Sequence, residues 1–339
     1  MVKNFEHFQS AHCENGVTTN LLRGVGVNFL TEPLSFGIGS GLFFIYIPLL
    51  KVNNGPAFAF RTMPGLIFKR TCNELKIPLT KKTFSNREKA KLFLDQCLQN
   101  GIPVGCQVGV YYLSYFPKEY RFHFNAHNLI VYGKEGDDYL ISDPVMETVT
   151  TLSTYELERV RFAKGPLAPN GKLYFPENPG ILNEQIVRNA IKNGIKRNVR
   201  DMIYLPGPIV GVGGIKYTAG RIKKWRDKLG VEKAGLYLAQ LVRMQEEIGT
   251  GGGGFRYLYG AFLQEAHQFH KDDKLILASS KITEAGDLWR TAAVQASGIY
   301  KGRITAQSDF DLMGDYLLKI AEVEKETFTI LSKIEWKNG

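Results

Sequence analysis

The sequence predicts an α+β protein in which a mixed first half is followed by a mainly helical second half. In the first half, strand-like runs such as IPVGCQVGVYY (102–112) alternate with helical stretches such as SNREKAKLFLDQCLQNG (85–101). Beyond residue 180, apolar residues recur mainly at helical spacing. A chain of 339 residues is long enough for two domains. We therefore expect one domain over residues 1–165 and a helical domain over 166–339.

The first helix is expected to begin near Cys13 and to end at Gly24. The residues VTTNLLRG that lead to this glycine have helical character, and glycine commonly terminates helices. Asn15 and Gly16 weaken the prediction, because both are poor helix formers. The helix would present Cys13 in its opening turn.

The apolar stretch LSFGIGSGLFFIYIPLL (34–50) carries no charge and raises the question of a membrane span. It is at the short limit of length for a span, and glycines, serines and Pro48 interrupt it. We expect instead a glycine-rich turn followed by a buried strand, GLFFIYI, and no membrane span.

A helix and three strands are predicted in the middle of the first half. Ser85 can cap the helix over 85–101, and Gly101 can end it. A strand over 102–112 follows. NLIVYG and DYLISDP then read as two strands around the polar turn KEGDD, which together form a hairpin.

A change of composition separates the two halves. The segment KGPLAPNGKLYFPENPG (164–180) is rich in proline and glycine and is typical of a linker or a domain-crossing loop. Six helical patterns follow it, over 181–203, 218–229, 232–248, 255–270, 281–297 and 307–334. The sequence contains no strong internal repeat.

The four cysteines indicate a reducing compartment, and we expect the cytoplasm. None of them forms a CxxC pair, so neither a disulfide framework nor a cysteine zinc site is indicated. The opening residues MVKNFEHFQS lack the apolar core of a signal peptide. Apolar residues make up 44% of the chain, as in ordinary globular proteins.

Positive charge is concentrated in residues 181–230. The whole chain has a net charge of +10, and this window alone holds eleven Lys and Arg against three acids, a balance of +8. Such a patch attracts an anionic partner, although a charge run is often only a solvated helical face. No nucleic-acid-binding motif and no aromatic interleaving accompany it, so we expect no nucleic-acid partner.

Cys13 is the candidate nucleophile. The first turn of a helix stabilises a thiolate through the helix dipole, and its free amide groups can hold an oxyanion. The alternative is a small buried hydrophobic residue, which is the commoner role of a free cysteine.

His127 and Asp143 are the candidate base and orienting acid. If Glu135 is the centre of the hairpin, His127 lies opposite Asp143 and Leu129 opposite Ile141. Opposed Cβ atoms in an antiparallel pair are about 4.5–5.5 Å apart. This register would place a carboxylate beside an imidazole, as acyl chemistry by a cysteine requires.

Two other motifs suggest chemistry only weakly. His123 and His127, in HFNAH, would be about 13 Å apart on an extended strand, so we expect no metal site. GTGGGG (249–254) contains GxGxxG but follows a helical pattern, which argues against a nucleotide site. We expect it to be a flexible backbone cradle near the substrate, with Arg256 behind it.

Glu32, in LTEPLSFG, has two interpretations. A carboxylate among apolar and glycine residues could hold an amine substrate. It could equally be a loop acid that satisfies nearby backbone groups.

Several motifs in this order resemble the butirosin-biosynthesis acyltransferase family. They are HCENG near the start, LTEPLSFGIGSGLFF, AHNLIVYG and ISDP. GTGGGGFRYLYGAFLQEA (249–266) resembles the helical domain that usually follows in this family. The resemblance covers most of the chain and implies a papain-like, cysteine-peptidase-type N-terminal domain with an antiparallel sheet.

The resemblance also implies an activity in secondary metabolism. Cys13 would take an acyl group from the phosphopantetheine thioester of an acidic acyl carrier protein, which would dock on 181–230. His127 would act as base and then as acid, and Asp143 would orient it. A small-molecule amine would accept the acyl group, and the enzyme would need no cofactor of its own. Gln9 is four residues before Cys13, closer than the oxyanion-hole glutamine of papain-like peptidases, so its role as a substrate-binding residue departs from the usual pattern.

Two other functions remain open at this point. A cysteine hydrolase or peptidase would use the same three residues, whereas a non-catalytic binding protein would bury Cys13 as inert packing. Alkylation separates the second from the rest, because an inert buried thiol does not react. The basic window and the added helical half favour the acyltransferase.

Overall fold

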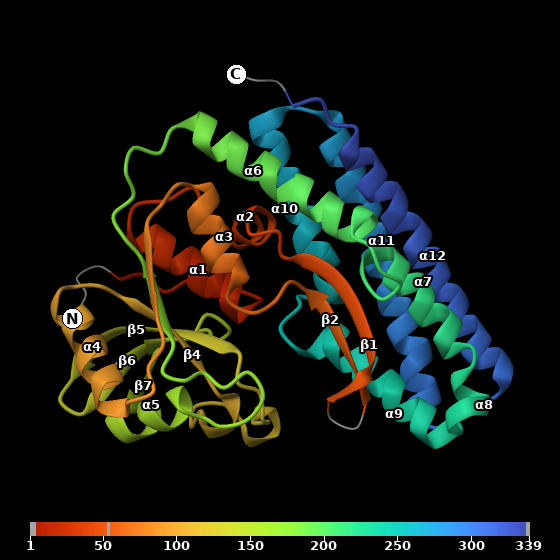
Figure 1. Ribbon diagram of the computed structural model, residues 1–339, viewed down its shortest axis with the longest axis horizontal. Helices are drawn as coiled ribbons and strands as arrows, with labels where there is room; N and C mark the ends of the chain where they lie inside the picture. Colours follow the sequence, from red (N-terminus) through yellow and green to blue (C-terminus); the bar gives the residue numbers. More distant parts are fainter. Residues whose placement is uncertain (1–4, 53–54, 337–339) are drawn as a thin grey trace. The chain divides into compact units, whose positions relative to one another are not determined.

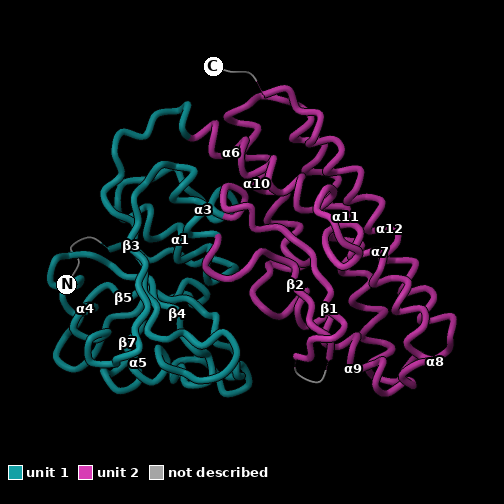
Figure 2. Tube along the Cα trace, viewed as in Figure 1, with its two compact units in different colours: residues 1–35, 67–186 teal, residues 36–66, 187–339 magenta. Residues whose placement is uncertain are grey.

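The chain forms two compact units, and each is built from two separate segments of sequence (Figure 2). The computed structural model describes residues 5–52 and 55–336. Unit 1 comprises residues 1–35 and 67–186, and unit 2 comprises residues 36–66 and 187–339. The division expected at residue 165 therefore differs from the compact units in two places.

Unit 1 contains a six-stranded sheet in which every pair of neighbours is antiparallel. In spatial order its strands are β3 (Leu79–Lys82), β8 (Leu173–Pro176), β4 (Val104–Val108), β5 (His127–Glu135), β6 (Asp138–Ser142) and β7 (Thr150–Ser153). The prediction that 164–180 is a linker or a domain-crossing loop is wrong for β8, whose residues are all buried. Proline and glycine flank this strand but do not interrupt Leu173, Tyr174 and Phe175, so composition hid it.

Four helices and two short 3-10 turns complete the main elements of unit 1 (Figure 1). They are α1 (Cys13–Gly24), α3 (Leu66–Glu74), α4 (Arg87–Gln99), α5 (Thr154–Arg161), η1 (Val110–Tyr112) and η2 (Lys118–Tyr120). The helix predicted over 85–101 is confirmed as α4. Its N-cap is Asn86, whose side chain accepts a hydrogen bond from the amide of Lys89, and not Ser85.

One core of unit 1 is formed by the sheet together with α4 and α5. Alternate residues of the central strands, such as Cys106, Leu129 and Ile141, are buried there with Leu94 of α4 and Leu157 of α5. The alternation of a strand and the repeat of a helix bring these apolar side chains to one layer.

The hairpin of β5 and β6 exists, but its predicted register is wrong. Its turn lies at Gly136 and Asp137, where Gly136 has a φ of 60°, so that Glu135 pairs with Asp138. A bulge between Val131 and Gly133 then shifts the pairing by one residue, as bulges do. His127 and Asp143 therefore do not face each other across the ladder.

Unit 2 joins a two-stranded ribbon to a set of helices. The ribbon consists of β1 (Leu42–Val52) and β2 (Gly55–Arg61), paired antiparallel. The helical elements are α6 (Glu184–Val199), η3 (Arg200–Tyr204), α7 (Gly211–Ile222), α8 (Trp225–Leu229), α9 (Val231–Val242), η4 (Arg243–Glu247), η5 (Gly253–Phe255), α10 (Arg256–His270), α11 (Asp273–Tyr300) and α12 (Gln307–Ser332). The long helices α11 and α12 lie side by side (Figure 1). The helical prediction for the second half is confirmed, and the α+β class with it.

The apolar stretch 34–50 is divided between a helix and a strand. Its first residues belong to α2 (Glu32–Ile38), and its last residues belong to β1. The expected strand is thus present, with alternate residues buried in its first half, whereas most of the expected glycine-rich turn is helical. Among the described residues, no helix has the length and apolar character needed to cross a membrane.

Candidate active site

Cys13 is the first residue of α1, as the sequence predicts. His12 caps the helix, since its Nδ1 accepts a hydrogen bond from the amide of Asn15 at 3.3 Å. That bond requires an unprotonated Nδ1 on His12. The thiol side chain of Cys13 is largely buried, with the residue 8% exposed.

Glu32 fixes the chain immediately before Cys13. Its two carboxylate oxygens accept hydrogen bonds from the amides of Ala11 and His12, at 2.9 and 2.8 Å. Burial raises the pKa of Glu32, and these backbone bonds act against that shift. The contacts favour the interpretation of Glu32 as an acid that satisfies backbone groups, and an amine-binding role remains a prediction.

The chain that precedes α1 lies against the segment that contains Asp143. The amide of Ser10 donates to the carbonyl of Pro144 at 2.7 Å, and His7 contacts Ser142 Oγ at 2.8 Å. Gly16 allows this approach, because a Cβ there would lie 2.4 Å from the Cβ of Pro144. The weak helix former in the first turn is therefore needed to place Cys13 close to the end of β6.

The side chains of His127 and Asp143 meet although their strands do not align them. Nε2 of His127 lies 2.6 Å from Oδ2 of Asp143, and both residues are buried. Asp143 lies just beyond the last residue of β6, at the turn that begins with Pro144. Its position after the ladder has ended allows it to reach the imidazole.

The imidazole of His127 is electrostatically coupled to both neighbours. Burial disfavours its charged form, but the carboxylate of Asp143 and the thiolate of Cys13 outweigh burial and raise the pKa of His127 to about 10. Hydrogen bonds to both groups act in the same direction. The structure thus brings Cys13, His127 and Asp143 together in unit 1 and favours a positively charged His127 at neutral pH.

Tyr115 is a member of this site that sequence reasoning missed. Its hydroxyl donates to Oδ2 of Asp143 at 2.7 Å, while the amide of Val145 donates to Oδ1 at 3.2 Å. Burial raises the pKa of Tyr115 well above its ordinary value, and the charge of Asp143 adds to the shift, so the phenol stays a donor. Tyr115 lies in an irregular segment after η1, where no periodicity could have indicated its direction.

The same segment covers His127 with an aromatic ring. The ring of Phe116 packs edge-on against the imidazole, with centroids 5.4 Å apart. An apolar ring at this point limits the access of water to the His127–Asp143 pair, which strengthens electrostatic interactions within it.

Asn128 is the second residue that the sequence analysis missed. Its Nδ2 lies 4.0 Å from Sγ of Cys13 and donates to the carbonyl of Ala126 at 3.1 Å. Its Oδ1 accepts a hydrogen bond from the hydroxyl of Tyr174 at 2.8 Å. Asn128 directly follows the candidate base His127 in the chain, and this adjacency could have suggested it as a site residue. Adjacent residues of a strand are expected to point to opposite faces, however, so the sequence did not place Asn128 beside Cys13.

The remaining predicted site residues lie apart from these contacts. Gln9 is exposed. Arg256 belongs to unit 2, where it is fully buried and its Nε and Nη2 bond the carboxylate of Glu324 at 2.9 and 3.0 Å. Its Nη1 donates to the carbonyl of Gly254, so all three nitrogens have acceptors and substrate binding by Arg256 stays an unsupported prediction.

GTGGGG forms a turn in which two amides bond side chains nearby in the sequence, and its role as a flexible backbone cradle stays a prediction. The glycines 251–254 have positive φ values, which glycine tolerates, and the next residue, Phe255, also has a positive φ of 71°. The amide of Gly252 donates to Thr250 Oγ1, and that of Gly253 donates to Glu246 Oε1, both at 3.1 Å. The amide of Gly253 is therefore already bonded to Glu246 and is not free to bind an anion.

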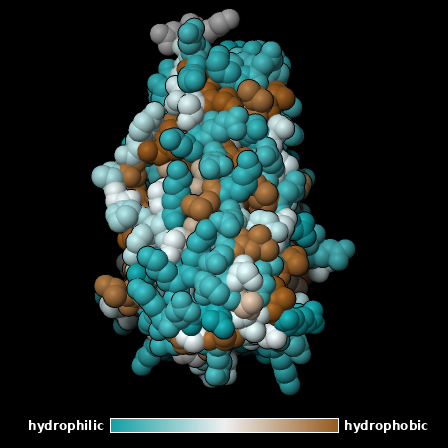
Figure 3. Space-filling model, turned by 90° about the vertical axis from the view of Figure 1, so that its right-hand side faces the viewer, coloured by the Kyte–Doolittle hydropathy of each residue, from teal (hydrophilic) through white to brown (hydrophobic). Residues whose placement is uncertain are grey.

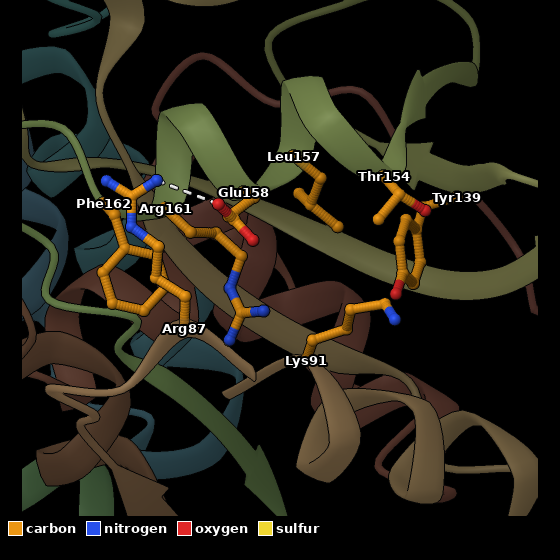
Figure 4. Close-up of a pocket in the computed structure, with 8 residues that line it drawn as sticks. All are labelled: Arg87, Lys91, Tyr139, Thr154, Leu157, Glu158, Arg161 and Phe162. Carbon is orange, nitrogen blue, oxygen red and sulfur yellow. Dashed lines mark hydrogen bonds and ion pairs between the residues drawn. The ribbon is translucent and has the colours of Figure 1, made fainter. Parts of the chain in front are cut away.

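A small basic pocket lies between α4 and α5 (Figure 4). Its lining residues are Arg87, Lys91, Tyr139, Thr154, Leu157, Glu158, Arg161 and Phe162. Arg87 is paired with Glu158 at 2.9 Å. The cavity of about 10 Å³ has room for roughly one water molecule, so it is too small for a substrate.

His123 and His127 have different neighbours. The ring of His123 stacks on Tyr111 with centroids 4.1 Å apart, whereas His127 bonds Asp143. Within residues 5–52 and 55–336, no three His, Cys, Asp or Glu side chains are grouped as metal ligands would be.

Two known families match the chain, one in each half. Residues 12–144 match a family described as butirosin biosynthesis protein H, N-terminal. Residues 155–331 match a family described as a domain of unknown function (DUF4872). No curated protein matched the chain. The first match contains Cys13, His127 and Asp143.

Proposed function

The chain belongs to the butirosin biosynthesis protein H family, and we propose that it is a cysteine-dependent acyltransferase of a biosynthetic pathway. One observation carries the proposal, namely that Cys13 begins a helix beside a buried imidazole that bonds a buried carboxylate. An imidazole held in this way can exchange a proton with a thiol and with an amine.

In the first step, the thiolate of Cys13 attacks the carbonyl carbon of a thioester on an acyl carrier protein. The electron pair of the C=O bond moves onto oxygen, and the new C–S bond forms. Collapse of this intermediate breaks the bond to the phosphopantetheine sulfur, which leaves and takes a proton from His127. The enzyme then carries the acyl group as a thioester on Cys13.

In the second step, an amine attacks the Cys13 thioester. His127, now neutral, takes a proton from the amine nitrogen, and the intermediate collapses to an amide. Cys13 leaves as a thiolate, which restores the charged pair with His127. Asp143 stays ionised throughout and holds the imidazole through Nε2, so that the other ring nitrogen handles the proton.

A papain-like architecture for unit 1 is part of the proposal. An N-terminal cysteine-bearing helix and an antiparallel sheet that supplies the histidine support it. The family match supports the secondary-metabolite context.

The basic window 181–230 is proposed as the docking surface for an acidic carrier. In α6 the side chains of Val187, Ile191 and Ile195 are buried, as a helix with one apolar face requires, and Lys196 is exposed. Three further lysines of the window, Lys216, Lys224 and Lys228, are also exposed. Arg200 pairs with Asp201 at 2.6 Å and Arg226 with Asp227 at 3.7 Å, and the balance of +8 already counts both acids. Lys223 pairs with Asp315 at 2.5 Å, and because Asp315 lies outside the window, this pair lowers the effective charge below the sequence balance.

The test is to incubate the protein with a set of acyl carriers and to measure its intact mass. We expect a mass gain of one acyl group on the wild type, and none on Cys13→Ala. Cys97→Ala is the matched control, because burial raises the pKa of the Cys97 thiol and makes it a poor nucleophile. Retention of full loading by Cys13→Ala would contradict the assignment.

The same experiment separates the alternatives. An acyl-enzyme that persists until an amine is added indicates a transferase. Loss of the acyl group to water without an amine indicates a hydrolase with the same three residues. A protein that neither loads nor reacts with iodoacetamide at Cys13 is a non-catalytic binding protein.

A further inference from the structure

We propose that Asn128 is the side-chain donor that stabilises the oxyanion formed on the substrate at Cys13. The inference rests on the proposed acyl transfer and adds a catalytic residue to it. Sγ of Cys13 has the amide Nδ2 of Asn128 at 4.0 Å, and Asn128 is only 3% exposed. When an acyl carbon bonds to Sγ, its oxygen lies two bonds from the sulfur, within the reach of this amide.

The orientation of the Asn128 amide follows from its partners. The carbonyl of Ala126 can only accept, so the group that faces it at 3.1 Å must be the NH₂. Oδ1 therefore faces the hydroxyl of Tyr174, which donates to it at 2.8 Å. One of the two Nδ2 hydrogens bonds Ala126, and the second is directed to Cys13.

Tyr174 reaches Asn128 across an intervening strand. In the sheet, β4 lies between β8, which carries Tyr174, and β5, which carries Asn128. Gly105 of β4 pairs with Tyr174, and a Cβ on Gly105 would lie 2.6 Å from the ring. The missing side chain lets the phenol lie over β4 and hold the amide, and Phe68 packs on the ring with centroids 4.6 Å apart.

The surroundings of Asn128 suit an oxyanion donor better than those of Gln9. Gln9 is exposed, whereas Asn128 is buried and held at both ends. A donor that is fixed before the reaction needs no reorganisation as charge develops on oxygen. The amide groups of the first turn of α1 can supply a second donor.

Two reactions of Cys13 separate this role from a general effect on the thiol. Acylation by p-nitrophenyl acetate forms an oxyanion, whereas alkylation by iodoacetamide displaces iodide and forms none. We expect Asn128→Ala to slow acylation by about 10²–10³-fold and alkylation by less than about threefold, since loss of one oxyanion donor costs that much. Asn128→Leu keeps a similar volume and removes the donor without adding a charge, so it should show the same selective loss.

Tyr174→Phe tests the positioning of the amide and leaves the ring in place. We expect a smaller loss of acylation and unchanged alkylation, because the amide then loses one anchor. Tyr139→Phe is the matched control, since that buried hydroxyl bonds Asp95 and none of the site residues. It should leave the ratio of the two rates unchanged.

The outcomes that overturn the inference are distinct from failure of the proposed function. Equal losses of acylation and alkylation in Asn128→Ala would show that Asn128 only supports the thiolate. Unchanged acylation, or a wild type that is alkylated but never acylated, would also exclude an oxyanion role. A wild type that reacts with p-nitrophenyl acetate but with no carrier thioester would contradict the acyl-carrier proposal. The ratio of the acylation rate to the alkylation rate would still decide the role of Asn128.

Discussion

For a single residue, His127, burial and charge act in opposite directions. Burial favours the neutral imidazole, yet two anionic neighbours favour the cation, and the pKa rises to about 10. The buried carboxylate of Asp143 has hydrogen-bond partners in Tyr115, His127 and the amide of Val145, which compensate for its burial. The charged state of the site thus depends on hydrogen-bond donors that surround one carboxylate.

We predict that His127 is protonated at pH 8, where an ordinary histidine with a pKa of 6.5 is neutral. Imidazole nitrogen shifts in a ¹H–¹⁵N NMR titration measure this directly. Asp143→Asn should lower the pKa of His127, because the substitution removes the carboxylate that stabilises the cation.

His270 is the internal reference for this titration. Burial lowers the pKa of His270, so its signal should change at lower pH than that of His127. A midpoint for His127 near 6.5 in the wild type would contradict the charged pair.

For an element, α1, the position of the first residue is set by the chain around it. Glu32 holds the amides before Cys13, and the chain that precedes the helix bonds the end of β6 through Ser10 and Pro144. Within the helix, Glu14 accepts a hydrogen bond from the amide of Ile67 at 3.0 Å, at the start of α3. These contacts decide where the thiol lies relative to His127.

We predict that Gly16→Ala lowers the free energy of unfolding by about 1–3 kcal/mol, as overpacking of a close contact does. The new Cβ would lie 2.4 Å from that of Pro144 and 2.7 Å from that of Ser10. The displaced helix should also slow iodoacetamide alkylation of Cys13. Denaturant unfolding and an alkylation time course measure the two effects.

Gly24→Ala is the matched control at the other end of α1. A Cβ there has no neighbour within 4 Å, and alanine is the better helix former. We expect equal or slightly higher stability and unchanged alkylation. If both substitutions had the same effect, Gly16 would not be required for the close approach of α1 to Pro144.

In the whole molecule, the two units depend on different kinds of interior. Unit 1 buries a polar, charged site, whereas unit 2 buries a bidentate ion pair between Arg256 and Glu324 among aromatic rings. Glu324 accepts from Arg256 and from Nε1 of Trp289, at 2.8 Å for the indole. The guanidinium carbon lies 5.4 Å from the ring centroids of Phe60 and Trp289.

We predict that Glu324→Gln destabilises unit 2 by about 3–5 kcal/mol, because it leaves the buried Arg256 without a counter-charge. Glu326→Gln is the control on the same helix, since Glu326 is exposed and pairs with Lys281 at the surface. It should have little effect. Denaturant unfolding measures both, and a Glu324→Gln variant as stable as the wild type would exclude a stabilising role for the pair.

The face of the molecule shown in Figure 3 is more hydrophilic than apolar, with hydrophobic residues scattered over it. Exposed charges mainly set the rate of association and its dependence on salt. A carrier that docks on 181–230 should therefore bind more weakly as salt is added.

We predict that reversal of Lys192 and Lys196 to Glu raises the KM for the carrier and flattens its salt dependence, while alkylation of Cys13 is unchanged. Reversal of Lys301 and Lys333, outside the window, changes the net charge equally and is the control. Steady-state kinetics at several salt concentrations distinguish the two pairs. If the variant with Lys192 and Lys196 reversed had an unchanged KM at low salt, residues 181–230 would be a solvated face and not the docking surface.

The sequence by itself determined the elements whose cause is local. Periodicity predicted α4 and the helices of unit 2, and turn residues predicted the β5–β6 hairpin, because each depends on neighbours within a few positions. Local signals also placed Cys13 at the start of α1, and the same stretches of sequence named His127 and Asp143 as candidates.

Only the tertiary structure decided which distant groups meet. The turn at Gly136 and Asp137 displaced His127 from its predicted partner on the ladder, and the chain after β6 brought Asp143 back to the imidazole. Tyr115 reaches Asp143 from an irregular segment, and Asn128 is held by the phenol of Tyr174, which lies over Gly105. No periodic pattern in the sequence indicates either contact. Arg256 turned inward because Glu324, 68 positions away, supplied the counter-charge. Such contacts depend on the packing of segments remote in sequence, which periodicity and composition do not encode.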